Sequence, residues 1–348
     1  MPHEPPLAHL RHEKAVVSAI VPYTGLILSI CCVLMFLLRY YILEPLAILI
    51  FKRNYLGLDP NRQRGTINHM MAVATKALLL LIASYPVIAI IAVRDFRAPL
   101  VPGSALRMGD ALVVISEIFC AMYIFELLWR TQVSLIGQLH HIGAIVIAQS
   151  AIVLGFDPSH SSDAGIEFVL CLIWGFFDVL AEFHPHLAML IYRYRPAAHG
   201  LNARVLRVVA CTEVVSTTVE TVVVMSLFGS LWHDWTLGLK IATPILHCLF
   251  SYAQLSGVRT FWAMAADEDR KAKGEVVVPH RTRGWWGDRW ARARVGMGEE
   301  KEGETGGGVA MDVERGGNST QGRVERKKDV RVSEREKVSK AYLGIVRK

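Results

Sequence analysis

Residues 15–38 read AVVSAIVPYTGLILSICCVLMFLL and contain no charged side chain. A helix needs about 20 apolar residues to cross the ~30 Å hydrocarbon core of a bilayer. This stretch is therefore long and apolar enough for a transmembrane helix. It is longer than the apolar region of a signal peptide and has no small-residue cleavage site after it, so we expect it to stay in the protein.

Further apolar runs of this kind follow along the chain. They lie at 70–93, 111–129, 133–156, 164–192, 208–231 and 237–262. The sequence thus predicts an all-α fold, a polytopic transmembrane helix bundle with about seven spans and a range of six to eight. A shorter apolar segment, 40–51, contains Pro45. It predicts a kinked extension of the first helix or an interfacial segment.

The basic residues between the spans predict the orientation. Loops 39–68, 130–132 and 193–207 carry ten Lys and Arg, and the loops of the opposite side carry five. Basic loops stay in the cytosol. We therefore expect a luminal N-terminus and a cytosolic C-terminus.

The composition changes near residue 263. Of 38 Lys and Arg, 20 lie from Arg270 onward. Residues 280–295 alternate Trp with Arg, which favours anionic lipid headgroups over nucleic acid. Residues 296–348 are too polar to fold and predict a disordered cytosolic tail, a candidate for binding a protein partner. The predicted divisions are 1–64 with the first helix, the transmembrane domain 65–262, the juxtamembrane segment 263–295 and the tail 296–348.

Ionisable residues inside the apolar runs predict a polar cavity. Each costs ~2.5–3.5 kcal/mol at the centre of a span, so such residues normally face the bundle interior. Asp178, Glu182 and His186 are four apart and share one helical face. We expect the cavity to open toward the cytosol between the third and sixth spans. The candidate residues are Glu126, His140, His141, Asp178, Glu182, His184, His186, Glu213 and Glu220.

Two further expectations concern single acids. Glu126 and His140 flank the turn at 130–132 and are expected to meet across it. Glu117 is expected to snorkel from its helix end. The alternative for all these polar residues is a purely structural one, in which they bridge helices.

Three segments carry a resemblance. YIFELLW (123–129), QLHHIGA (138–144) and FDVLAEFHPH (177–186) resemble the TLC domain of translocation-associated membrane proteins and ceramide synthases. That family has an acid late in one span, a His-His pair early in the next, and an acid before a proline in the one after. Glu126, His140–His141 and Glu182-x-x-Pro185 match it, within roughly 65–262.

The resemblance implies an endoplasmic reticulum membrane protein acting in sphingolipid or acyl-lipid metabolism or homeostasis, with acyl-CoA as substrate and no cofactor. The ceramide synthase signature continues from His-His through Asn and Arg to Asp-x-x-Asp. Here His141 is followed by the apolar stretch 142–156. The chain is more similar to the divergent TLC-domain proteins of lipid homeostasis.

Three classes of function follow. In an acyl-CoA-dependent acyltransferase, His140 or His141 acts as general base and Asp178 or Glu182 orients it. The second class is a non-catalytic translocation or trafficking helper. The third, a haem or metal redox protein, is least favoured, because no second histidine pair is evident on a facing span. The six cysteines lie in apolar runs without a CxxC pair, so we expect packing roles and no metal site.

Overall fold

The computed structural model describes residues 18–92, 96–154 and 164–277. Contacts divide the chain into Met1–Glu275 and Val276–Lys348. Nearly all described residues belong to the first unit. The predicted headgroup-binding segment 280–295 and tail 296–348 lie outside the described residues.

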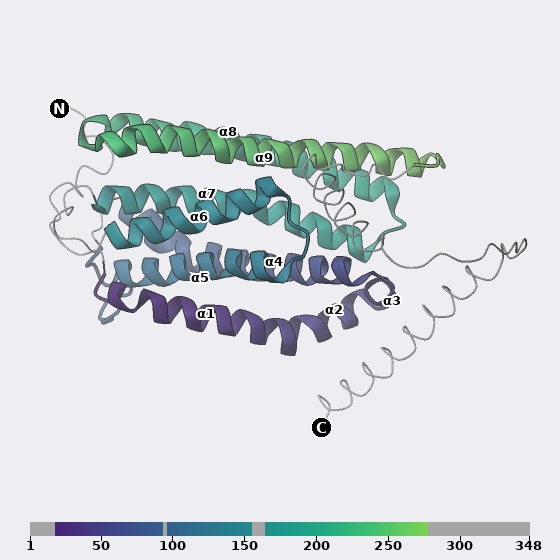
Figure 1. Ribbon diagram of the computed structural model, residues 1–348, viewed down its shortest axis with the longest axis horizontal. Helices are drawn as coiled ribbons and strands as arrows, with labels where there is room; N and C mark the ends of the chain where they lie inside the picture. Colours follow the sequence, from purple (N-terminus) through teal and green to yellow (C-terminus); the bar gives the residue numbers. More distant parts are fainter. Residues whose placement is uncertain (1–17, 93–95, 155–163, 278–348) are drawn as a thin grey trace, which may run out of the picture. The chain divides into compact units, whose positions relative to one another are not determined.

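The described residues are helical, and Figure 1 shows the long helices running side by side. The elements are η2 (Val21–Tyr23), α1 (Thr24–Leu38), η3 (Arg39–Leu43), α2 (Glu44–Phe51), α3 (Arg53–Leu56), α4 (Pro60–Ala92), α5 (Met108–Trp129), α6 (Leu135–Leu154), α7 (Ala164–Tyr194), α8 (His199–Ser230), η5 (Trp232–Asp234) and α9 (Leu237–Ala272). Within these residues no strand forms, and Pro99 and Arg107 make an isolated bridge. The all-α prediction is confirmed.

The segment 40–51 continues the first helix. One membrane-competent helical stretch runs from Val21 to Phe51. It contains a π-helical turn, Arg39–Leu43, immediately before α2. Pro45 lies in the first turn of α2. A proline is tolerated there because the turn before it relieves the clash of its ring with the preceding backbone. Of the two alternatives for 40–51, the structure shows the helical extension.

Five helical stretches of the described chain are long and apolar enough to cross a membrane: Val21–Phe51, α4, α5, α6 and α8. They make the chain an integral membrane protein. The remaining two predicted spans correspond to α7 and α9, which form long helices packed against α8. That α7 and α9 also cross the bilayer stays a prediction.

The outer faces of these helices carry large apolar side chains. Leu26 on α1 is 61% exposed and Leu81 on α4 is 79% exposed, and similar residues surround both. Soluble monomers rarely expose apolar patches of this extent. In a bilayer these faces contact lipid tails, so the surface agrees with the apolar composition of the helices.

In the interior, three helices pack against α6. These are α5, α7 and α9, while α4 packs against α5 and α7. Glu117 in the middle of α5 is fully buried, and Gln149 Nε2 of α6 donates to its Oε2 at 2.9 Å. The prediction that Glu117 snorkels is wrong, because α5 begins at Met108 and places this acid well inside the helix. The hydrogen bond between Gln149 and Glu117 links α6 to α5.

Candidate functional site

His140 on α6 faces two acids of α7. Its Nε2 lies 3.2 Å from Asp178 Oδ1 and 3.2 Å from Glu182 Oε1. Asp178 and Glu182 are one helical turn apart, so they present their carboxylates on the same face. His140 and Asp178 are buried and Glu182 is partly buried. The structure thus brings three of the four predicted catalytic residues into direct contact.

Two side chains from other helices hold these acids. Lys76 of α4 is completely buried, and its Nζ donates to Glu182 Oε2 at 2.8 Å. The hydroxyl of Tyr123 on α5 donates to Asp178 and lies 3.1 Å from Glu182 Oε2. These donors fix both carboxylates with their remaining oxygens directed at His140.

Lys76 was not among the residues that we predicted for the polar cavity. It is the one charged residue in the run 70–93. The rule that intramembrane charges face the interior identifies it as a candidate in the same way as the acids. Tyr123 gives no comparable signal, because a tyrosine in an apolar run usually serves packing.

His141 belongs to a second polar group. Its Nε2 lies 3.6 Å from Glu126 Oε2, and Arg130 donates to Glu126 Oε1 at 2.6 Å. Its ring stacks on Tyr123 with 4.3 Å between ring centroids. The predicted contact of Glu126 with His140 is therefore wrong. Consecutive helical residues point about 100° apart, so one histidine faces α5 and the other faces α7.

A polar cavity of about 330 Å³ opens beside these groups. Its walls come from α5, α6, α7, α8 and also α9, whereas the sequence predicted the third to sixth spans only. The predicted residues that line it are Glu126, His140, His141, Glu182, His186 and Glu213. On α9, Gly257 approaches Glu213 so closely that an added Cβ would lie 2.9 Å from Glu213 Oε1.

Three of the predicted cavity residues do not line this cavity: Asp178, His184 and Glu220. His184 Nδ1 contacts the backbone oxygen of Leu180 in its own helix at 3.1 Å. Two positions from Glu182 and from His186, it points away from the face they share. Glu220 accepts a hydrogen bond from Gln254 at 2.9 Å and lies two helical turns beyond Glu213. Neither lines the polar cavity.

His186 makes a contact that the spacing did not predict. Its Nδ1 lies 2.9 Å from Nδ1 of His69 on α4. The pair shares one proton, because a hydrogen bond between two ring nitrogens needs one donor and one acceptor. His69 lies just before the run 70–93 and therefore outside the residues that the intramembrane rule selects.

Apolar space continues from His140 into the bundle. A pocket of about 40 Å³ is lined by His140, Trp174 and Phe250, and His140 and Gln254 line both this pocket and the polar cavity. A further pocket of about 60 Å³ is lined almost entirely by apolar side chains. Both pockets share Phe119 and Gly175. His140 therefore lies at the boundary between the polar cavity and the apolar pocket next to it.

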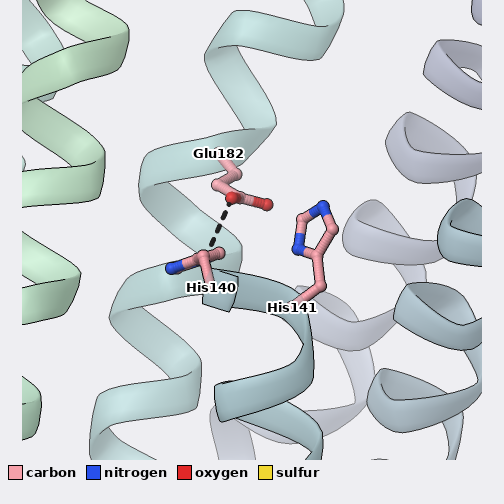
Figure 2. A group of neighbouring side chains, drawn as sticks. All are labelled: His140, His141 and Glu182. Atoms are coloured by element: carbon pink, nitrogen blue, oxygen red, sulfur yellow. Dashed lines mark ion pairs between the residues drawn. The ribbon is translucent and has the colours of Figure 1, made fainter. Parts of the chain in front are cut away.

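Figure 2 shows how the side chains of His140, His141 and Glu182 lie relative to one another. His140 and His141 extend from α6, and Glu182 of α7 points into the space between the two imidazoles. One ligand atom from each of the three residues lies within 4.8 Å of the others. An imidazole beside carboxylates is suited to proton transfer, and the same set of atoms is suited to holding a cation.

Comparisons with protein-family models, with curated proteins and with solved structures find no match to this chain. The fold and the site define its class: an integral membrane helical protein with a buried histidine–carboxylate site inside the bundle.

Proposed function

We propose that this protein binds an amphiphilic lipid inside the bundle and acts in acyl-lipid or sphingolipid metabolism or homeostasis. The proposal rests on the position of His140, which lines both the polar cavity and the adjoining apolar pocket. The polar group of a lipid fits the cavity, and the apolar pockets have room for the first methylene groups of its chain. The resemblance to the TLC domain supports the same function.

The charges favour a polar group that donates hydrogen bonds. Glu126, Glu182 and Glu213 line the cavity together with one cation, Arg130. Arg130 is already paired with Glu126. An amine or hydroxyl finds acceptors here, whereas a phosphate would meet uncompensated carboxylates. We therefore propose an amine- or hydroxyl-bearing lipid.

In the catalytic form of this proposal the reaction is acyl transfer from acyl-CoA. The lipid's amine or hydroxyl attacks the thioester carbonyl and passes its proton to His140. The new C–N or C–O bond forms, the C–S bond breaks, and the CoA thiol leaves with a proton. Asp178 and Glu182 orient the imidazole and stabilise its charged form. Lys76 and Tyr123 position the two acids.

The cellular placement completes the proposal. The family resemblance supports the endoplasmic reticulum, and the excess of basic residues in loops 39–68, 130–132 and 193–207 supports a cytosolic C-terminus. The cavity lies near Arg130, at the end of α5 that this orientation places toward the cytosol, where acyl-CoA is present.

A lipid profile tests the catalytic form. Cells lacking the protein receive the wild type, the double variant His140→Ala/His141→Ala, or His184→Ala, whose histidine lies outside the cavity. We expect the double variant to lose about 100-fold or more of the lipid product, the range of general-base catalysis, and His184→Ala to match the wild type. Equal profiles from wild type and double variant at equal protein levels would contradict catalysis and leave the non-catalytic helper.

A further inference from the structure

The geometry points to a binding site for a divalent transition metal of the zinc class, held by His140, His141 and Glu182. One ligand atom from each lies within 4.8 Å of the others. Two imidazoles and one carboxylate form a ligand set typical of zinc sites that keep one position open. The proposal goes beyond lipid binding and does not depend on it.

Unsatisfied polar atoms supply a second, independent observation. The side chains of His140 and His141 are only 6% and 8% exposed. Yet both ring nitrogens of His140 and Nδ1 of His141 are buried without a hydrogen-bond partner in the described chain. Buried polar atoms in native proteins are normally bonded. A cation between the rings and the carboxylate provides a partner for one nitrogen of each ring.

The contacts of His140 Nε2 also favour a bound cation at this position. It lies 3.2 Å from both Asp178 Oδ1 and Glu182 Oε1 but is aligned for a hydrogen bond with neither. Asp178 Oδ1 is itself buried and unsatisfied. His140 Nε2 therefore faces two carboxylate oxygens, an arrangement that either a proton on this nitrogen or a metal cation stabilises.

The surrounding carboxylates fit the role of outer partners. A metal-bound histidine usually gives its second ring nitrogen to a carboxylate, which orients the ring. Glu126 Oε2 lies 3.6 Å from His141 Nε2, which leaves the unpartnered Nδ1 of His141 for the ion. Asp178 Oδ1 faces Nε2 of His140, the same nitrogen that faces Glu182, so Asp178 is placed to complete the coordination.

The net charge of the cluster admits a divalent ion despite two nearby cations. Glu126, Asp178 and Glu182 outnumber Lys76 and Arg130, so one negative charge is uncompensated when both imidazoles are neutral. Lys76 occupies Oε2 of Glu182, and Oε1 is the oxygen that faces His140. A divalent ion with one bound hydroxide brings the cluster to neutrality.

The open position of such an ion faces the polar cavity, which His140, His141 and Glu182 all line. There the ion would polarise the thioester carbonyl of acyl-CoA, and its bound water would take the proton-accepting role that a free imidazole otherwise has. The same ligand types also suit ferrous iron, so the metal analysis includes both ions.

The experiment uses the full chain, purified in detergent through a peptide-epitope tag without histidines. Zinc and iron are quantified by mass spectrometry. The protein is then stripped with a chelator and titrated with Co²⁺, whose visible d–d absorption reports tetrahedral nitrogen and oxygen ligands. We expect about one ion per wild-type chain and a saturable cobalt band. His141→Gln and Glu182→Asp should weaken cobalt binding by at least about 100-fold, and His184→Ala should leave it unchanged.

Wild-type protein that holds neither metal and develops no cobalt band would overturn the site, and so would a band that survives in His141→Gln. The wild-type titration does not depend on any variant folding. Measuring lipid and metal binding on the same preparation separates the two proposals: protein that binds lipid but takes up no metal contradicts the metal site alone, and protein that takes up metal but binds no lipid contradicts the proposed function alone.

Discussion

Lys76→Met is expected to destabilise the bundle by about 3–5 kcal/mol, because it removes the buried cation that pairs with Glu182. Lys76 is fully buried and its Nζ lies 2.8 Å from Glu182 Oε2. Methionine has nearly the same shape, so packing is kept while Glu182 and Asp178 are left with Tyr123 as their donor. Thermal unfolding of the purified protein in detergent measures the loss.

A second substitution separates charge from packing. In Lys76→Met/Glu182→Gln both partners are neutral, so much of the lost stability should return. Lys273→Met changes an exposed lysine after α9 and should stay within about 0.5 kcal/mol of the wild type. If Lys76→Met unfolds at the wild-type temperature, the ion pair described here is not formed in the bilayer protein.

Gly175→Leu should weaken lipid binding by at least about tenfold without unfolding the protein. Gly175 lines both apolar pockets, and a Cβ added there meets no atom within 4 Å. A leucine therefore fills the pockets instead of clashing. Each excluded methylene of the lipid chain costs ~0.8 kcal/mol, so the loss of two or three lowers affinity by at least about tenfold. Leucine also favours helix over glycine by about 1 kcal/mol.

The matched control is Gly229→Leu on α8, where an added Cβ also meets open space and which lines neither the polar cavity nor the two apolar pockets. Both variants gain helix propensity, and only Gly175→Leu fills the pocket. Lipid bound per chain, measured by native mass spectrometry, distinguishes them. Wild-type lipid occupancy in Gly175→Leu would show that the chain does not enter these pockets.

The helices could be predicted because run length and charge depend only on local sequence. The spacing of Asp178 and Glu182 also gave their common face correctly, since helical periodicity fixes which side chains share a face. Periodicity does not give the direction in which a face points. That is why Glu126 was assigned to His140 when its partner is His141, and why α9 was not expected among the cavity walls.

Other site residues depend on contacts between distant segments. Tyr123 lies on α5 and Lys76 on α4. Their bonds to Glu182 form only when helix packing places them against α7, and the sequence does not give that packing. His184 was wrongly included because histidine content was weighed without its angular position, which lies off the Glu182–His186 face. Lys76 alone carried a legible signal, as a single charge inside an apolar run.

Photo-crosslinking reports whether a lipid lies inside the bundle with its polar group at His140. A lipid amine carrying a diazirine near its polar end is irradiated with the wild-type protein in bilayers, and labelled peptides are mapped by mass spectrometry. We expect labels on pocket residues such as Phe119 and Trp174, and we expect unlabelled lipid and Gly175→Leu to reduce them. Labelling confined to outward-facing positions such as Leu26 and Leu81 would contradict a lipid bound inside the bundle.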